Sequence, residues 1–303
     1  MSDVSPKAGL TVAKVIIYDI VQQARTSAAL SSTDAANCYN SIAHAIALLV
    51  FQAFGVPLKA VESILTVFEE MKYFLWTAYG DFKKNSGSTI DLQFQGFCKG
   101  IGAAQAGLAL NSITMFCAHK IKGHGGHFGC PISNLTGHIA ALLFVDDTDL
   151  IHINLKSEET KTVAHQSMQD SISNWGWLLI ASGGAFKPPK CFYHLIYFCW
   201  NTDGSWTYEN NEDLEDFNIS VPMLDGSQVQ IEHAAVDTAK ETLGVWTSPV
   251  RDSKAALETM QNKADKWISR AKEGTLSRRD VWFLLDRQLW PRVGYGLNRK
   301  TWH

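Results

Sequence analysis

Residues 140–153 read Ala-Ala-Leu-Leu-Phe-Val-Asp-Asp-Thr-Asp-Leu-Ile-His-Ile, an acidic cluster between two apolar runs. We interpret Ile139–Val145 and Leu150–Leu155 as the strands of a hairpin, which places Asp146, Asp147 and Asp149 in its turn. Adjacent carboxylates beside apolar surface repel each other and lose hydration, and a hard divalent cation with oxygen ligands relieves both penalties. The segment therefore predicts either a cation-binding turn or, alternatively, a solvated turn rich in aspartate.

Asp34 is a second acidic candidate far upstream of this turn. It follows Ser31, Ser32 and Thr33, which read as the polar end of a short strand. Taken alone, Asp34 could equally be the N-cap of a helix. Together with Asp146 and Asp147 it could complete a three-carboxylate site for two metal ions about 3.5–4 Å apart. Such a site activates a 3′-hydroxyl and stabilises the transition state of in-line phosphoryl transfer.

Several segments together resemble one enzyme family. Phe144-Val-Asp-Asp147 resembles the (Tyr/Phe)-x-Asp-Asp signature of reverse transcriptases, and Asp34-Ala-Ala-Asn-Cys-Tyr39 resembles the first palm motif of that family. Three further segments are similar to later motifs in the family's order: the Gln-Gly loop at Gln95–Gly102, the lysine-bearing turn at Gly183–Cys191, and the strand near the primer grip at Leu243–Val245. From about Val12 to Pro249, the chain is similar to reverse transcriptases of the retrotransposon type.

This resemblance implies an α/β polymerase palm, with an antiparallel sheet backed by helices, that acts as an RNA-directed DNA polymerase. It implies that Asp34, Asp146 and Asp147 are the catalytic metal ligands and hold two Mg²⁺ ions, or Mn²⁺ in their place. Three kinds of substrate contact are also implied: Tyr39 as the steric gate that favours deoxynucleotides, Gln95 and Gly96 beside the incoming nucleotide, and Lys190 toward the pyrophosphate. The implied partners are an RNA template, a DNA primer and deoxynucleoside triphosphates.

The resemblance also suggests how the chain is divided. We expect a palm domain over residues 1–250, including a residual fingers helix over 11–28, and a partial helical thumb or C-terminal connection over 251–303. Only about 33 residues precede Asp34, so we expect an N-terminally truncated fragment with most of the fingers missing. Ile101 and Gln105 replace the polar residue and the proline expected after the Gln-Gly pair.

These departures leave other functions open. The main alternative is a catalytically inactive retroelement remnant that at most binds nucleic acid. A cyclase of the palm type, acting on nucleoside triphosphates without a primer, is a third possibility.

The composition indicates a folded protein with a basic C-terminal segment. The 303 residues are 46% hydrophobic and 19% charged, with a net charge of -3, which excludes general disorder. Residues 251–303 carry twelve Lys and Arg against six Asp and Glu, so this segment is basic and could contact phosphates.

Export and membrane insertion are not indicated. No apolar run is long enough to cross a bilayer, and residues 1–7 do not resemble a secretory signal. The six cysteines include no Cys-x-x-Cys pair, and the Cys and His residues between 117 and 138 match no standard zinc-finger spacing. We therefore expect reduced thiols and an intracellular protein, in the nucleus or the cytoplasm, that is not secreted and not bound to a membrane.

Overall fold

The chain forms two compact units, each assembled from separate stretches of sequence. The sheet unit comprises Ser27–Tyr193 and Glu215–His233, and the terminal unit comprises Met1–Thr26, His194–Leu214 and Ala234–His303. The boundary after Tyr193 falls within one strand of the main sheet, Phe192–Ile196, which is described with the sheet unit. The predicted division into residues 1–250 and 251–303 stays a prediction. The computed structural model describes residues 6–36, 38–70, 73–78, 80–86, 96–97, 102–129, 133, 135–154, 160–210, 214, 216–242, 245–252, 254–274 and 276–290.

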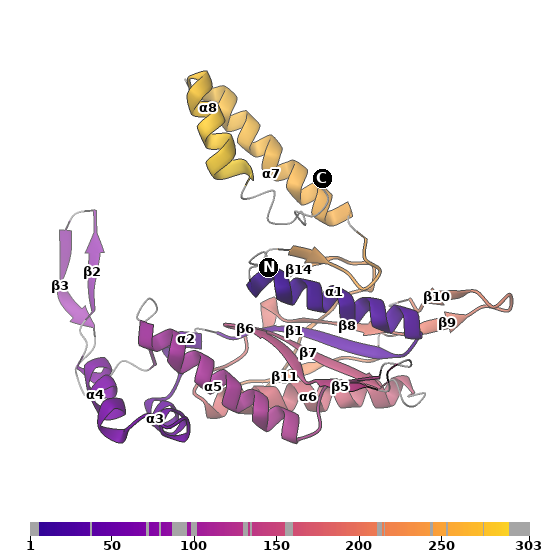
Figure 1. Ribbon diagram of the computed structural model, residues 1–303, viewed down its shortest axis with the longest axis horizontal. Helices are drawn as coiled ribbons and strands as arrows, with labels where there is room; N and C mark the ends of the chain where they lie inside the picture. The colour runs from indigo at the N-terminus through magenta and orange to yellow at the C-terminus, as the bar shows by residue number, and fades with distance from the viewer. Residues whose placement is uncertain are drawn as a thin grey trace. The chain divides into compact units, whose positions relative to one another are not determined.

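The sheet unit alternates short strands with helices, as expected for an α/β protein (Figure 1). Its elements are β1 (Ala28–Asp34), α2 (Cys38–Ser41), α3 (His44–Ala53), α4 (Leu58–Glu69), β2 (Tyr73–Thr77), β3 (Gly80–Ser86), α5 (Gly102–Ile121), β4 (Gly126–Gly129), β5 (Thr136–Ile139), β6 (Ala141–Phe144), β7 (Asp147–Asn154), α6 (Lys161–Ala181), the 3-10 turn Pro188–Lys190, β8 (Phe192–Ile196), β11 (Ser220–Pro222), β12 (Gln228–Gln230) and β13 (Glu232–His233).

The main sheet has the strand order β13-β8-β1-β7-β4-β5, and β6 also pairs with β7. Strand β7 is antiparallel to β1 and to β6 but parallel to β4, and β13 is parallel to β8. The α/β prediction is confirmed. The sheet is mixed, however: the predicted antiparallel arrangement describes strands β1, β6 and β7, which surround the acidic residues, but not the sheet as a whole.

Helix α6 packs on this sheet and presents small and apolar residues to it. Helix α6 lies against β1 and β7 and also contacts α5 (Figure 1). Its N-terminus is capped by Thr160, whose side chain accepts a hydrogen bond from the Val163 amide. Ala164, Met168 and Ile172 are completely buried along its inner face. The helix continues through Gly176, where an added Cβ would collide with Pro222 and Phe186.

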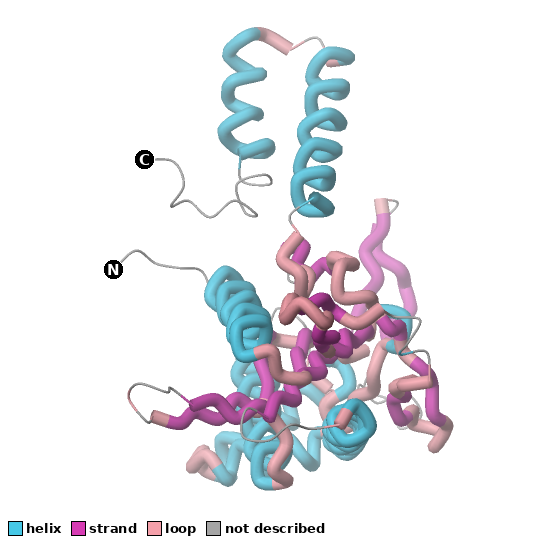
Figure 2. The backbone as a smooth tube through the Cα atoms, turned by 90° about the vertical axis from the view of Figure 1, so that its right-hand side faces the viewer, coloured by secondary structure: helices cyan, strands magenta, loops and turns pink. Residues whose placement is uncertain are grey.

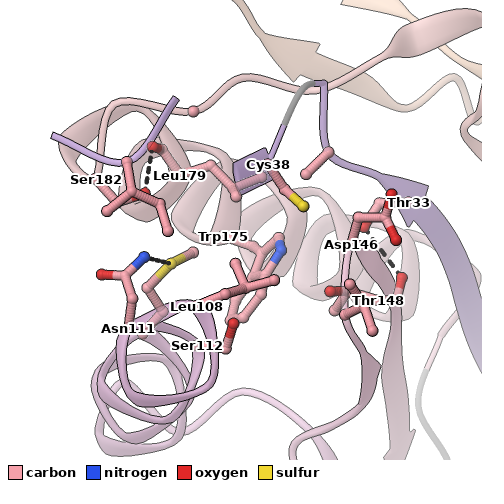
Figure 3. Close-up of a pocket in the computed structure, with 15 residues that line it drawn as sticks. Thr33, Cys38, Leu108, Asn111, Ser112, Asp146, Thr148, Trp175, Leu179 and Ser182 are labelled. Atoms are coloured by element: carbon pink, nitrogen blue, oxygen red, sulfur yellow. Dashed lines mark hydrogen bonds between the residues drawn. The ribbon is translucent and has the colours of Figure 1, made fainter. Parts of the chain in front are cut away.

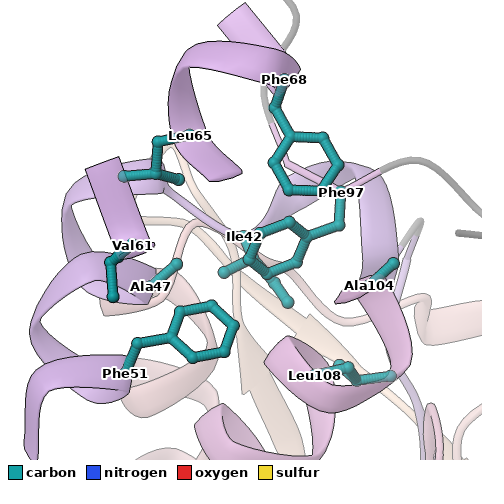
Figure 4. Close-up of a cluster of buried hydrophobic side chains, with 9 residues drawn as sticks. All are labelled: Ile42, Ala47, Phe51, Val61, Leu65, Phe68, Phe97, Ala104 and Leu108. Carbon is teal, nitrogen blue, oxygen red and sulfur yellow. The ribbon is translucent and has the colours of Figure 1, made fainter. Parts of the chain in front are cut away.

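A second apolar core joins α3, α4 and α5 around the ring of Phe97 (Figure 4). The Phe97 ring is completely buried and packs edge-on against Phe51 and at a tilt against Phe68, with centroids 6.3 and 5.1 Å apart. Gly107 of α5 provides the space for this ring, because a Cβ there would overlap it. This core anchors residues 96–97 although they lie between stretches outside the described residues.

The terminal unit contains one N-terminal helix, two small hairpins and a helical segment at the end of the chain. Figure 2 shows α8 folding back along α7. The elements are α1 (Pro6–Ala24), β9 (Phe198–Trp200), β10 (Trp206–Tyr208), β14 (Lys240–Thr242), β15 (Val245–Thr247), α7 (Lys254–Glu273), α8 (Arg278–Leu284) and a π-helical turn at Leu285–Leu289. Ser277 and Asp280 form a capping box at the start of α8, which explains where that helix begins.

Several element boundaries differ from those that the sequence predicts. The expected fingers helix over 11–28 is α1, which ends at Ala24, because residues from Ala28 onward belong to β1. From the sequence we expect a polar loop at Gly80–Ser88, but this stretch contains strand β3. We likewise expect a Gly- and His-rich loop around Gly123–Gly129, and it contains strand β4. Within the described residues, no helix combines the length and the apolar character needed to cross a bilayer.

Candidate active site

The central pair of strands brings the two distant acidic segments together. Strands β1 and β7 are antiparallel, in a register that runs from Ala28 opposite Ile153 to Asp34 opposite Asp147. Residues paired in this way have Cα atoms about 4.5–5.5 Å apart and side chains on the same face of the sheet. The Ala35 amide donates a hydrogen bond of 3.2 Å to the carbonyl of Asp146, which extends the contact into the turn. Asp34 and Asp147 are therefore neighbours, as predicted.

The turn that carries Asp146 is tighter than the sequence suggested. Because Phe144 pairs with Asp147, only Val145 and Asp146 lie between the strands. Val145 has φ = 60°, a conformation that is costly for a β-branched residue and is usually occupied by glycine in two-residue hairpins. The expectation that all three aspartates lie in the turn is corrected: Asp147 and Asp149 belong to β7, and Asp146 alone stands at the tip.

Asp149 is held below the turn by a buried hydrogen bond from Ser32. Ser32 and Asp149 are register partners, and the Ser32 hydroxyl donates to the Asp149 carboxylate. Both residues are only 9% exposed. The sequence predicts Asp149 in the acidic turn, and the resemblance to reverse transcriptases implies no role for it. The run of small polar residues from Ser31 to Thr33, inside a buried strand, is the sequence feature that indicates a buried polar partner such as Asp149.

The carboxylates of the acidic face carry more negative charge than the nearby positive charge offsets. This face consists of Asp34, Asp146, Asp147 and Asp149. Burial, and after it the charges of Asp146, Asp34 and Asp149, raises the pKa of Asp147 to about 6, and only Lys190 opposes this effect. Asp147 therefore binds a proton more readily than an ordinary aspartate, because burial and the neighbouring carboxylates disfavour its ionised form. An additional cation near Asp147 would stabilise its ionised carboxylate.

Lys190 supplies the positive charge closest to Asp34. Its Nζ lies 2.6 Å from Oδ2 of Asp34, in an ion pair whose lysine side chain is 57% exposed. This contact, and the negative charges of Asp147 and Asp146, raise the pKa of Lys190. The sequence placed Lys190 toward a pyrophosphate; the structure places it against the first acidic residue.

Tyr39 lies in the short helix α2, next to the apolar core of α3, α4 and α5. Burial raises the pKa of Tyr39, and Cys38 and Asp146 contribute to the rise, so its hydroxyl is within electrostatic range of the acidic turn. The predicted gate residue and the predicted metal ligands thus share one region of the sheet unit.

Gly96 approaches the backbone of α2 very closely. It has φ = 86°, and a Cβ at this position would overlap the backbone of Tyr39 and Asn40. The Phe97 amide donates a hydrogen bond of 2.6 Å to the carbonyl of Tyr39. Packing against α2 therefore accounts for the glycine, and its predicted contact with a nucleotide stays a prediction. Gln95 lies outside the described residues, as do Leu243 and Gly244.

A small cavity of about 30 Å³ lies beneath the acidic turn, between it and helices α5 and α6 (Figure 3). Asp146, Thr33 and Thr148 line one side of it, and Leu108 and Trp175 line another. The space is sufficient for about two water molecules. The indole nitrogen of Trp175 is buried and has no hydrogen-bond partner among the described residues, which is consistent with solvation by such a water.

The acidic residues do not form a closed metal cage. Within the part of the chain that the structure describes, no group of three or more His, Cys, Asp or Glu side chains is arranged to hold a metal ion. Asp34 and Asp147 share a register pair, and Asp146 stands beside them in the turn. The structure thus brings the predicted residues into one place without the geometry of an assembled three-carboxylate site.

Comparison with known proteins finds only solved structures of low sequence identity and low TM-score. The sequence matches no protein-family model and no curated protein. A telomerase from Candida tropicalis in complex with the TWJ fragment of telomeric RNA is similar to it, with 13% identity and a TM-score of 0.39 over 62% of this chain and 29% of that one. The apo telomerase from the same organism, truncated from its C-terminal domain, gives 12% identity and a TM-score of 0.39 over 68% and 40%. The chain thus spans well under half of either structure, and likenesses of this extent carry no argument about its activity.

Proposed function

We propose that this protein is the palm of an RNA-directed DNA polymerase of the retrotransposon type, which adds deoxynucleotides to a primer 3′-hydroxyl. The observation that carries the proposal is the β1–β7 register, which pairs Asp34 with Asp147 and places Asp146 in the adjoining turn. These are the residues that the resemblance to reverse transcriptases requires to meet. An α/β sheet with helices on it supports the same assignment.

The residues of this face fit a divalent cation in two respects. Their donor atoms are carboxylate oxygens, the ligands that Mg²⁺ prefers, and the ammonium of Lys190 already stands beside Asp34 as a cation. We propose that Asp34, Asp146 and Asp147 hold two Mg²⁺ ions, with Mn²⁺ as a substitute. When bound, these ions lower the pKa of the attacking hydroxyl and offset the charge that develops on the phosphoryl oxygens.

The other residues bind and orient the substrate in this proposal. Tyr39, beside the acidic turn, fills the space that a ribose 2′-hydroxyl would occupy and so selects deoxynucleotides. Gln95 and Gly96 contact the incoming nucleotide, and Lys190 donates toward its pyrophosphate. Helices α7 and α8 act as a partial thumb, whose basic residues contact the phosphates of an RNA template paired with a DNA primer.

Primer extension tests the proposal directly. The purified chain is incubated with an RNA template, a labelled DNA primer, deoxynucleoside triphosphates and Mg²⁺. We expect extension that Asp146→Ala and Asp147→Ala each abolish, whereas Asp216→Ala, an exposed aspartate of the same unit, leaves it unchanged. Tyr39→Ala should retain extension and accept ribonucleotides more readily. Equal extension by the wild type and the two acidic variants contradicts the assigned roles.

A second candidate function is a remnant that binds nucleic acid without catalysis. It is favoured by the absence, within the described residues, of any group of three ligands arranged for a metal ion. In this case an RNA–DNA hybrid should bind with an affinity that falls steeply as salt increases, while primer extension is not detected. Detectable extension that depends on Asp147 excludes the remnant.

A further inference from the structure

Lys190 and Asp34 form a contact that a divalent cation bound to Asp34 would oppose. The lysine Nζ is 2.6 Å from Oδ2 of Asp34 and donates a hydrogen bond to that oxygen. Mg²⁺ binds carboxylate oxygens at about 2.0–2.1 Å, so an ion on the same carboxylate would lie only a few ångströms from the ammonium. The two positive charges would repel each other, and this repulsion favours departure of the lysine side chain from Asp34.

The backbone that carries Lys190 is fixed to the end of β1. The Lys187 amide donates a hydrogen bond of 2.9 Å to the carbonyl of Asp34, and the Ala36 amide donates one of 2.8 Å to Ala185. Pro188 and Pro189 restrict the turn itself, and the Lys190 amide closes it by a bond of 2.9 Å to the carbonyl of Lys187. The turn therefore stays in place when the ion pair breaks.

The two side chains of the pair differ in their freedom to move. The Asp34 side chain is 12% exposed and lies at the end of a strand that is buried throughout. The Lys190 side chain is 57% exposed and can turn toward solvent without disturbing any packed group. When the contact breaks, Lys190 moves and Asp34 stays.

On the basis of the proposed function, we propose that Lys190 is a positioning residue that occupies Asp34 in the metal-free protein and is released when a divalent cation binds there. Its ammonium then becomes available to a phosphate group of the nucleotide only after the cation is in place. The lysine thus influences the cation concentration at which the site fills. It also imposes an order of events, in which the cation binds before the lysine contacts the phosphate.

Binding of Mn²⁺ tests this inference without any catalytic readout. Free Mn²⁺ is measured by electron paramagnetic resonance during titration of the wild type, Lys190→Met, Lys190→Arg, Lys187→Met and Asp34→Asn, at fixed pH and ionic strength. Exposed ion pairs are weak, so we expect Lys190→Met to tighten binding by about threefold to tenfold. Lys190→Arg keeps a competing cation and should remain close to the wild type. Lys187→Met, which removes an exposed lysine of the same turn, should change binding less than twofold.

A second measurement uses the wild type alone and does not depend on the folding of a variant. Nitrogen-15 correlation spectra of the lysine ammonium groups should show a protected Lys190 signal without metal, and saturating Mg²⁺ should broaden or shift it. Unchanged Mn²⁺ affinity in Lys190→Met, or a Lys190 signal that Mg²⁺ does not alter, overturns the inference.

The failure of this inference and the failure of the proposed function give different results. If Mn²⁺ binds in a manner that requires Asp34 but Lys190→Met and Lys187→Met bind it equally, the lysine role is refuted and the polymerase proposal stands. If no variant binds Mn²⁺ through Asp34, both are refuted. Binding that is undetectable in the wild type and appears in Lys190→Met supports the inference in its strongest form.

Discussion

Replacing Asp147 by Asn should stabilise the metal-free protein at neutral pH. Burial and the neighbouring carboxylates raise the pKa of Asp147 from 3.8 to about 6, so its ionised form is penalised in the folded state. At 1.36 kcal/mol per pKa unit, the penalty reaches about 3 kcal/mol. Asparagine has nearly the same shape and carries no charge. We expect Asp147→Asn to raise the free energy of unfolding by about 1–3 kcal/mol at pH 7.5.

The pH dependence of this gain provides the decisive check. Because the folded pKa of Asp147 is higher than the unfolded one, its ionisation lowers stability as the pH rises from about 4 to about 6, and the effect is constant above that range. The advantage of Asp147→Asn should therefore be close to zero at pH 3.5 and reach its full value above pH 6.

Urea denaturation followed by tryptophan fluorescence measures the effect as a shift of the midpoint of up to about 1 M. The comparison must be between variant and wild type, since the buried imidazole of His119 has the opposite pH dependence over nearly the same range. Asp216→Asn, at an exposed position, should stay within about 0.5 kcal/mol of the wild type. Equal stability of wild type and Asp147→Asn at pH 7.5 refutes the electrostatic reasoning. A gain that persists at pH 3.5 shows that charge is not its cause.

Three further predictions concern the turn, the second core and the histidine. Val145→Gly should stabilise the protein by about 0.5–1 kcal/mol in urea titration, because glycine adopts φ = 60° freely, and a loss of stability contradicts the strain argument. Phe97→Ala should lower the free energy of unfolding by about 3–5 kcal/mol, because the ring is fully buried in the core beside α2; a loss below 1 kcal/mol shows that this core is not formed. Burial lowers the pKa of His119 to about 4, so protonation of this ring should destabilise the folded state between pH 6.5 and 4, and the stability of His119→Gln relative to the wild type should rise as the pH falls through that range. A nuclear magnetic resonance titration that places the pKa of His119 near 6.5 would contradict the last prediction.

Local sequence signals determined many elements of the fold. Asp203-Gly204 and Asp225-Gly226 are turn dipeptides, which favour the backbone of tight turns and so predict a hairpin at each position. Both hairpins are present, as β9–β10 and β11–β12. Ser277 before the last helix provides its capping box. The apolar runs on either side of Asp146 and Asp147 predicted two strands, which are β6 and β7. Each of these features depends on a few adjacent residues, and for that reason it could be found without coordinates.

Strands in polar stretches are harder to predict from the sequence. Such a stretch becomes a strand only when a neighbouring strand offers it backbone hydrogen bonds. Residues 81–86 and 126–129 contain glycine, lysine, asparagine or histidine in patterns typical of loops. They form strands because β2 pairs with β3, and because β5 and β7 pair with β4 on its two sides. Intrinsic strand preference is weak compared with such tertiary pairing.

The sequence alone singled out Asp34, Asp146, Asp147 and Lys190, because the segments that carry them resemble the motifs of one family in their order. The tertiary structure decided where these residues lie relative to one another. The register of β1 against β7 pairs Asp34 with Asp147, the strained two-residue turn leaves only Asp146 at the tip, and Lys190 lies on Asp34. Register and ion pairing depend on which distant segments meet and in what alignment, and that choice is made by the packing of the whole sheet unit.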